Sequence, residues 1–391
     1  MKLIYLTSRF PYPLNKGDKL RSYHQIKELS IQNDIYLISL SESKVSERSI
    51  VELNKYCKSV HVYHISLINR IFNLFKTLIN NRPFQVNYFY HQKIQKKINS
   101  NISIINPDHI ICQLVRTALY VKDEHSIPKT IDYMDALSKG LERRITISKF
   151  WQKPFVKMES QRMKRFENLA FEFFNNHIII SSIDRDEIAH INNKNIEIIP
   201  NGIDSNYFKK ITTNKIYDLI FIGNLSYIPN IEAAKYISKT IFPILKEKIP
   251  NIRILISGSN PSKKVLRLAN KNIKISGWVD DIRETYCSGK VFFAPMNLGS
   301  GLQNKLLEAM SLGIPCITSN LCNESLGGTH MKNIIIGNSA EEYISQILNI
   351  LNNSELISDI GKNGSEYVNK KFSWENSNKK LMGILKHKQS N

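Results

Sequence analysis

A lysine and a glutamate stand on one face of an expected helix, directly after a glycine-rich loop. The stretch 299–310 is GSGLQNKLLEAM, which places Lys305 and Glu308 at positions i and i+3. Glycines let a ligand approach the backbone amides, and the free N–H groups of a helix start attract anions. A carboxylate one turn later can accept hydrogen bonds from sugar hydroxyls. The spacing predicts a cradle for a diphosphate joined to a sugar; the alternative is an ordinary helix start with a local Lys–Glu pair.

A second polar loop, PLNKGDKLR at 13–21, follows the first expected strand. Gly17 supplies a tight turn, and Asp18 and Arg21 stand three residues apart at the start of the next helix. The functional interpretation is that this loop faces the diphosphate-linked sugar, with Gly17 passing close to it. The alternative is ordinary helix capping by Asp18.

Carboxylates also occur at two further strand ends. Asp135, in TIDYMDALS at 130–138, is placed to orient or deprotonate an acceptor hydroxyl, although it would serve equally as a helix N-cap. The Asp-x-Asp pattern in IDRDEI at 183–188 also occurs in metal sites. Because it opens a helix, where acidic residues complement the dipole, we expect capping and no metal there.

Short β-branched segments alternate with helical ones along the whole chain. This alternation is typical of parallel sheets covered by helices on both faces, an α/β doubly wound class. It pauses at the turn-rich stretch 198–208. We therefore expect an N-terminal Rossmann-like domain over 1–200, a second one over 201–371, and a final helix over 372–391. Strands are expected at 2–8, 34–40, 59–65, 109–113, 129–135, 177–182, 196–200, 218–224, 252–259, 273–279, 291–296 and 316–320.

The composition favours a cytoplasmic protein with anionic partners. The net charge is +20 over 391 residues, which suits nucleotides, phospholipid surfaces or nucleic acid, or else records a compositional bias. No membrane helix or signal peptide is expected, and five cysteines without a CxxC pair predict buried thiols. The basic, aromatic segments 67–82 and 139–174 suit the inner face of an anionic membrane, or are ordinary solvated helix faces.

The chain resembles the GT-B nucleotide-sugar glycosyltransferases, family 4-like, in the branch that builds bacterial surface polysaccharides. The motifs that carry the resemblance span nearly the whole chain, in the expected order. They are RFPYPLNKGDKLRSYH (9–24), IIPNGID (198–204), FIGNLSYIPNIEAAKYI (221–237), ISGWVDDIRETY (275–286), GSGLQNKLLEAM (299–310) and FSWE (372–375). The resemblance implies two Rossmann-like domains facing across a cleft, with the last helix crossing back to the first domain.

The resemblance also implies which residues meet each substrate. Lys305, Glu308 and Asp135 are the expected catalytic residues, and Asp18, Arg21 and Asp135 are expected to bind the acceptor. The donor is expected to contact Gly17, Gly223, Asn224, Gly258, Trp278, Gly299, Ser300, Gly301, Leu302, Gln303, Lys305 and Glu308.

Two positions depart from the family pattern. The wider family has two glutamates with seven residues between them; the second matches Glu308, but Ser300 stands at the first. The loop after FIGN has Asn224 and Ser226 where the family often has basic residues. Lys305 is therefore the main cation expected on the diphosphate.

The expected function is a retaining hexosyl transfer from a nucleoside-diphosphate sugar to a hydroxyl of a lipid-linked glycan in capsule, exopolysaccharide or lipopolysaccharide O-antigen synthesis. No metal or other cofactor is expected, and the enzyme is expected to be cytoplasmic or peripheral on the inner membrane face. The alternatives are a nucleotide-sugar epimerase of the same fold and a catalytically degenerate nucleotide-sugar-binding subunit. A nucleic-acid binder is disfavoured because no recognised reader motif is present.

Overall fold

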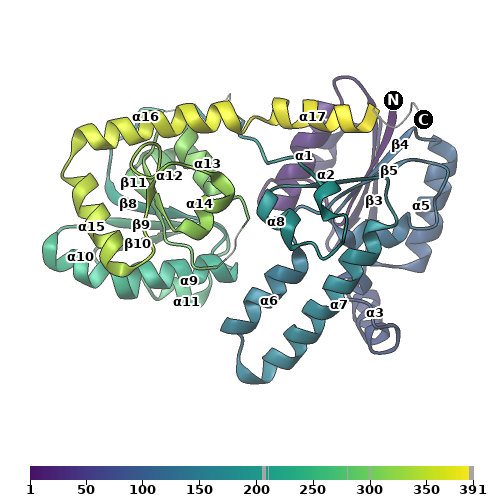
Figure 1. The fold of residues 1–391 in the computed structure, drawn as a ribbon, viewed down its shortest axis with the longest axis horizontal. Helices are drawn as coiled ribbons and strands as arrows, with labels where there is room; N and C mark the ends of the chain where they lie inside the picture. The colour runs from purple at the N-terminus through teal and green to yellow at the C-terminus, as the bar shows by residue number, and fades with distance from the viewer. Residues whose placement is uncertain (205–207, 210, 280, 299–300, 387–391) are drawn as a thin grey trace. The chain divides into compact units, whose positions relative to one another are not determined.

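The computed structural model describes residues 1–204, 208–209, 211–279, 281–298 and 301–386 (Figure 1). The chain divides into two compact units. Unit 1 comprises Met1–Pro200 together with Trp374–Asn391, and unit 2 comprises Asn201–Ser373. The chain thus leaves unit 1 after Pro200 and returns to it at Trp374.

Unit 1 is built on a seven-stranded sheet in which every neighbouring pair is parallel. Its strand order is β3-β2-β1-β4-β5-β6-β7. The strands are β1 (Lys2–Thr7), β2 (Asp34–Ser41), β3 (Ser59–His64), β4 (His109–Gln113), β5 (Lys129–Asp132), β6 (Asn176–Ile179) and β7 (Glu197–Ile198).

Helices connect these strands, as parallel pairing requires. The α-helices of unit 1 are α1 (Gly17–Leu29), α2 (Glu47–Asn54), α3 (Leu67–Asn80), α4 (Phe84–Phe89), α5 (Gln92–Ile105), α6 (Leu137–Ile147), α7 (Lys153–Phe171), α8 (Ser182–Glu187) and α17 (Trp374–Lys386). Short 3₁₀ turns are η1 (Val115–Tyr120), η2 (Phe150–Gln152) and η3 (Asn193–Asn195).

Two apolar cores lie on the two faces of this sheet, because successive strand side chains point to opposite faces. Ile4 and Leu6 join the core that α5 and α7 cover, whereas Leu3 and Tyr5 join the core that α1 covers. Helix α17 contributes buried Leu381 to the second core and lies beside α1 (Figure 1). Its first residue, Trp374, stacks on the His24 ring of α1, with 4.7 Å between the ring centres and 10° between the ring planes.

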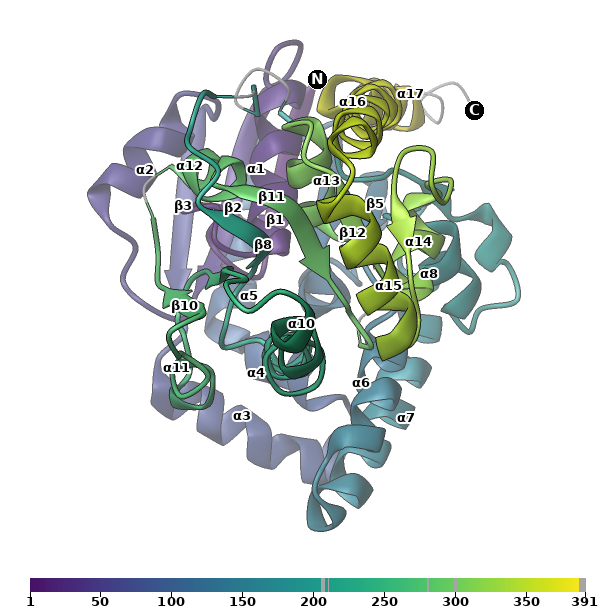
Figure 2. The ribbon, with the colours of Figure 1, turned by 90° about the vertical axis from the view of Figure 1, so that its left-hand side faces the viewer.

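Unit 2 has a six-stranded sheet, again parallel throughout, in the order β10-β9-β8-β11-β12-β13. Figure 2 labels four of these strands, β8, β10, β11 and β12. The strands are β8 (Tyr217–Ile222), β9 (Ile254–Ser257), β10 (Ile273–Ser276), β11 (Gly289–Ala294), β12 (Cys316–Thr318) and β13 (Ile335–Ile336). The helices are α9 (Ile228–Tyr236), π-helical η4 (Ile237–Ile241), α10 (Phe242–Lys248), α11 (Lys263–Leu266), α12 (Ile282–Cys287), α13 (Asn304–Ser311), α14 (Asn320–Leu326), α15 (Ala340–Leu351) and α16 (Ser354–Lys371).

The predicted fold class is confirmed: both sheets are parallel and alternate with helices. In each sheet the direction of the strand order reverses once, between β1 and β4 in unit 1 and between β8 and β11 in unit 2. Ligands of doubly wound folds bind where the strand order reverses, at the carboxyl ends of the strands. A ligand site is therefore expected at the carboxyl ends of β1 and β4 in unit 1 and of β8 and β11 in unit 2.

Candidate active site

Lys305 lies in the first turn of α13, at the carboxyl edge of the unit 2 sheet. Its Nζ donates to Oδ1 of Asn230 at 2.5 Å and lies 5.1 Å from the centre of the Phe221 ring. Burial lowers the pKa of this ammonium to about 8. No carboxylate among the described residues forms an ion pair with it. The structure thus places a desolvated cation without a charged partner where a ligand is expected.

Glu308 stands one turn further along α13 and is held by a different helix. Its Oε2 accepts a hydrogen bond of 2.7 Å from the hydroxyl of Tyr286, a buried residue of α12. Burial raises the pKa of the Glu308 carboxyl to about 7. The local Lys305–Glu308 ion pair, considered as an alternative from sequence, is absent among the described contacts. Both side chains remain half-buried and open to further partners.

Two glycines at the ends of neighbouring strands bring their loops into close contact. Gly258, directly after β9, has φ of +146°, and a Cβ there would lie 1.7 Å from the carbonyl oxygen of Gly223. A Cβ on Gly223, directly after β8, would lie 2.8 Å from Nδ2 of Asn230. That same amide donates to the carbonyl of Asn224 at 2.9 Å. Gly223 therefore makes room for the amide that holds Lys305, and Gly258 lets its loop lie against the Gly223 backbone.

The other expected donor contacts lie on the same edge of unit 2. Gln303 is the N-cap of α13, and its amide donates to the Gly301 carbonyl at 2.9 Å. Leu302 is buried, whereas Trp278, in the loop after β10, is 64% exposed. Gly299 and Ser300 lie outside the described residues, so their predicted roles stay predictions.

In unit 1, α1 begins at Gly17, in the loop that follows β1. Asp18 is not the helix cap: the N-cap residue is Lys16, and Asp18 lies in the first turn. Its carboxylate instead accepts a 2.8 Å ion-pair contact from Nη1 of Arg9. The capping interpretation of Asp18 is therefore wrong, and this carboxylate is part of a charged group on the carboxyl edge.

Arg21 has no exposed side-chain surface. Its Nε contacts Oδ2 of Asp132 at 2.5 Å, both side chains being 0% exposed, and its Nη1 donates to the Ile199 carbonyl at 2.9 Å. This buried ion pair and the bond to the Ile199 carbonyl hold the ends of β5 and β7 together with α1. This contact positions the residues around Asp132; an acceptor contact by Arg21 stays a prediction.

Asp135 leaves the carboxyl end of β5 through strained backbone. Met134, the residue before it, has a left-handed φ of 62°, and Leu114, after the neighbouring strand β4, has φ of 63°. Such conformations cost about 1–3 kcal/mol each and concentrate at functional sites. Residue 135 is exposed. Desolvation of its carboxyl group by the surrounding protein raises the pKa of Asp135, and the negative charge of the Asp184 carboxylate raises it further. A carboxyl group with a raised pKa is suited to proton transfer.

The Asp-x-Asp pattern makes structural contacts. Asp184 lies in the first turn of α8, its N–H bonded to the Ser181 cap, and Asp186 pairs with Arg185 and Lys194. Within the described part of the chain, no group of three His, Cys, Asp or Glu side chains is placed to hold a metal ion.

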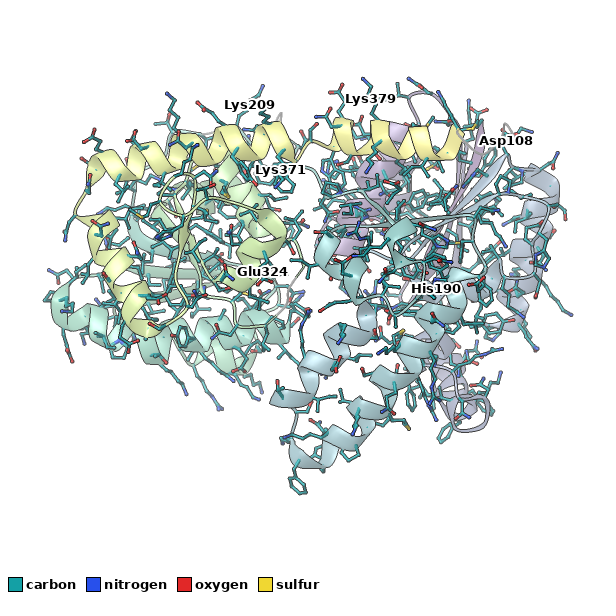
Figure 3. All side chains as sticks on the ribbon, in the orientation of Figure 1. Asp108, His190, Lys209, Glu324, Lys371 and Lys379 are labelled. Atoms are coloured by element: carbon teal, nitrogen blue, oxygen red, sulfur yellow. The ribbon has the colours of Figure 1, made fainter. Side chains whose placement is uncertain are left out.

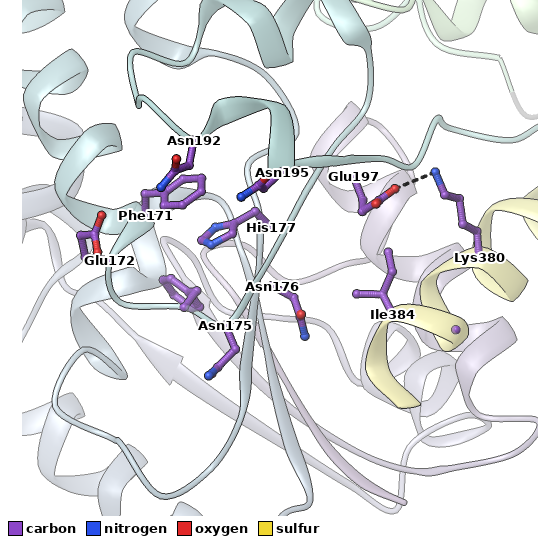
Figure 4. Close-up of a pocket in the computed structure, with 12 residues that line it drawn as sticks. Phe171, Glu172, Asn175, Asn176, His177, Asn192, Asn195, Glu197, Lys380 and Ile384 are labelled. Atoms are coloured by element: carbon purple, nitrogen blue, oxygen red, sulfur yellow. Dashed lines mark ion pairs between the residues drawn. The ribbon is translucent and has the colours of Figure 1, made fainter. Parts of the chain in front are cut away.

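A hollow of about 780 Å³ lies at the opposite, amino-terminal edge of the unit 1 sheet, beside β6, β7 and α17 (Figure 4). The Phe171 ring stacks on the rings of His177 and His190, with ring centres 3.7 Å and 3.8 Å apart. His190, labelled in Figure 3, also contacts Glu172 at 2.7 Å. None of the residues predicted from sequence lines this hollow, so it is separate from the candidate active site.

Sequence reasoning assigned no role to Asn230 or Tyr286, which hold Lys305 and Glu308. Both lie inside the quoted motifs 221–237 and 275–286, but their contacts join residues 75 and 22 positions apart. Nothing in local spacing reveals such a pairing.

Two parallel-sheet α/β units, with a glycine-rich, cationic edge on the second, define the GT-B class of glycosyltransferases. Residues 217–353 match the family described as "Glycosyl transferases group 1". The chain therefore carries a group 1 glycosyltransferase domain, and the protein is a glycosyltransferase of GT-B fold.

Two curated relatives match at the sequence level. An uncharacterized 44.6 kDa protein in the cps region of Klebsiella pneumoniae is 23% identical over 393 residues, covering 95% of this chain and 96% of that one. The UDP-Gal:alpha-D-GlcNAc-diphosphoundecaprenol alpha-1,3-galactosyltransferase of Escherichia coli is 31% identical over 149 residues, covering 32% of this chain and 37% of that one.

Solved structures match over nearly the full length. Sucrose-phosphate synthase from Thermosynechococcus elongatus superposes with a TM-score of 0.73 at 14% identity, covering 98% of both chains. Anabaena Alr3699/HepE in complex with UDP and glucose gives 0.70 at 13% identity, covering 98% of this chain and 99% of that one. At these identities the likeness establishes the fold.

Proposed function

We propose that this glycosyltransferase moves a hexose from a nucleoside-diphosphate sugar to a hydroxyl of a lipid-linked glycan, with retention of anomeric configuration, in surface polysaccharide synthesis. The observation that carries the proposal is Lys305, a half-buried ammonium with no ion-pair partner among the described residues, at the carboxyl edge of the unit 2 sheet. The structural relative that holds UDP and glucose supports a UDP-sugar donor, and the E. coli relative supports a lipid diphosphate acceptor.

In the proposed reaction the departing diphosphate gains negative charge as the sugar–oxygen bond breaks. Lys305 stabilises that charge, and Glu308, held by Tyr286, accepts hydrogen bonds from the sugar. Removing one such donor to a developing anion typically costs about 10²–10³ in rate. Asp135 orients the acceptor hydroxyl and receives its proton.

Thermal stability against UDP-, GDP-, ADP- and dTDP-sugars tests the donor site. A ligand at a hundredfold excess over Kd stabilises a protein by about 2.7 kcal/mol. We expect one donor to raise the melting temperature of the wild type but not of Lys305→Ala or Glu308→Ala. Lys332→Ala, at an exposed lysine of unit 2, is the matched control and should keep the shift. The absence of a shift with every donor would contradict the proposal and favour a role that involves no nucleotide sugar.

Product analysis then separates transfer from epimerisation. A transferase consumes the donor in proportion to the glycosylated acceptor formed, whereas an epimerase converts the sugar without any acceptor. Epimerised product in the absence of acceptor would overturn the proposed reaction while leaving the donor site intact.

We also propose that the enzyme works at an anionic membrane surface. Helix α3 exposes an apolar face, with Ile68 at 72% and Phe72 at 68%, and η2 exposes Phe150 at 85% and Trp151 at 61%. Basic residues surround both segments, an arrangement that favours binding at the surface of an anionic bilayer. None of the described helices is long and apolar enough to cross a membrane.

Co-sedimentation with phosphatidylglycerol vesicles tests this surface. We expect Phe72→Ser and Trp151→Ser to weaken binding by about tenfold each, equivalent to about 1.4 kcal/mol. Ile31→Ser, at a residue 73% exposed after α1, is the matched control and should bind as the wild type does. Equal binding of all variants, or equal binding to uncharged vesicles, would contradict the proposal.

A further inference from the structure

Two arginines converge on one aromatic ring at the carboxyl edge of the unit 1 sheet. Arg9 follows β1 and Arg116 follows β4, and these two strands are neighbours. Their guanidinium carbons lie 5.9 Å and 5.4 Å from the centre of the Phe89 ring of α4. Like charges repel, so bringing the two half-buried guanidinium groups together costs folding free energy.

The charge of Arg116 is not neutralised by a carboxylate. Its Nη2 and Nε donate to the neutral Oε1 of Gln85 at 2.6 Å and 3.2 Å, and no ion pair to it occurs among the described residues. Burial and then the nearby Arg9 lower the pKa of Arg116 to about 10. Asp135 follows β5, the strand next to β4, so both residues lie beyond the carboxyl ends of neighbouring strands.

Further cations surround the pair. Arg9 contacts Asp18 at 2.8 Å and Glu42 at 3.4 Å, and Arg70 of α3 contacts the same Glu42 at 3.5 Å. Lys19, also in the first turn of α1, has its pKa lowered by burial and by a neighbouring lysine. The cationic cluster, defined as Arg9, Lys19, Arg70 and Arg116, therefore outnumbers the carboxylates within it.

We infer that this cationic cluster binds the diphosphate that joins the acceptor glycan to its lipid, an inference that rests on the proposed function. Guanidinium groups bind phosphate oxygens in bidentate fashion, and each charge-assisted bond is shorter and stronger than a neutral one. The cluster lies between two features that such an acceptor requires. Asp135 follows β5, the strand next to the one that Arg116 follows. Arg70 belongs to α3, whose neighbouring Ile71 and Phe72 are exposed and apolar.

The test measures binding of citronellyl diphosphate, a short, soluble prenyl diphosphate, by calorimetry on the full-length protein. We expect Arg116→Gln and Arg9→Gln to weaken its binding at least tenfold while UDP binding stays unchanged. Arg48→Gln, at an exposed arginine of α2, is the matched control and should bind as the wild type does. Should Arg116→Gln fail to fold, Lys19→Gln provides the same comparison at a partly exposed side chain.

Three outcomes overturn the inference. The first is equal binding of citronellyl diphosphate by all variants. The second is loss of UDP binding instead, which assigns the cluster to the donor. The third is loss of binding to phosphatidylglycerol vesicles with citronellyl diphosphate binding intact, which assigns the cluster to phospholipid headgroups. Failure of the proposed function looks different: diphosphate binding would depend on the cluster, but no hexose would be transferred.

Discussion

Replacement of Lys305 by methionine tests the proposed donor site most directly. Methionine keeps an unbranched side chain in the space between Asn230 and Phe221 and removes the charge. A charge-assisted hydrogen bond contributes about 1.5–3 kcal/mol, which corresponds to about 10–150-fold in Kd. We therefore expect Lys305→Met to bind UDP weaker by that factor, measured by calorimetry at pH 7.

The pH dependence of UDP binding is the second half of this prediction. With a pKa of about 8, Lys305 is mostly protonated at pH 7 and mostly neutral at about pH 9. Phosphate groups, whose second pKa is about 6, stay ionised across this range. Wild-type affinity should therefore fall above about pH 8, whereas that of Lys305→Met should stay flat.

The same variant should not lose stability at pH 7. The folded-state pKa of Lys305 is depressed, so the fold favours the neutral form, and the charged form costs stability at every pH below about 8. That cost disappears as the pH rises through the window from about 8 to 10.5. Removing the charge should leave the melting temperature at pH 7 unchanged or raised. UDP affinity within threefold of wild type, with the same pH slope, would refute the role assigned to Lys305; Lys332→Met is the control.

Three further changes have defined outcomes. Tyr286→Phe removes the donor that favours ionised Glu308, so the pKa of Glu308 should rise further and the acid limb of the kcat/KM profile should move to higher pH; an unmoved limb would argue against a role for this carboxyl. Gly258→Ala puts a Cβ onto backbone at a φ that side chains rarely adopt, so urea denaturation should show a loss of about 3 kcal/mol or more; a loss below 1 kcal/mol would mean that the two loops separate easily. Asp135→Asn should lower kcat for transfer by about 10²-fold and leave UDP binding unchanged; normal turnover would remove Asp135 from the mechanism.

The alternation of strands and helices was predictable because parallel strands are buried on both faces and so form continuous apolar runs. The segment 2–8, for example, contains β1, and the segment 218–224 covers all but the first residue of β8. The placement of Lys305 and Glu308 on one helix was also predictable, since they are close in sequence. The surroundings of these two residues were not, because Tyr286 and Glu308 meet only once α12 and α13 have packed.

Arg21 and Arg116 show most clearly which contacts could not be predicted from the sequence. The sequence predicts Arg21 as an acceptor-binding residue at a loop-to-helix junction, whereas the structure buries it fully against Asp132, 111 residues away. Arg116 was not predicted as a site residue, because it is the only charged residue in the segment 110–121. Its significance comes from the neighbouring strand, which brings Arg9 to the same ring. Strand order, unlike strand position, depends on long-range pairing that residue patterns do not encode locally.

The return of α17 to unit 1 makes unit 2 an insertion in the chain of its neighbour. Leu381 and Leu385 belong to the same core as Leu3 and Tyr5, although all of residues 201–373 intervene. On the ribosome, unit 2 has its whole sequence available before unit 1 does. Unit 1 must therefore wait with one core uncovered until translation reaches Trp374 and beyond. During that interval the apolar face later covered by α17 is exposed, and the order of synthesis favours completion of unit 2 first.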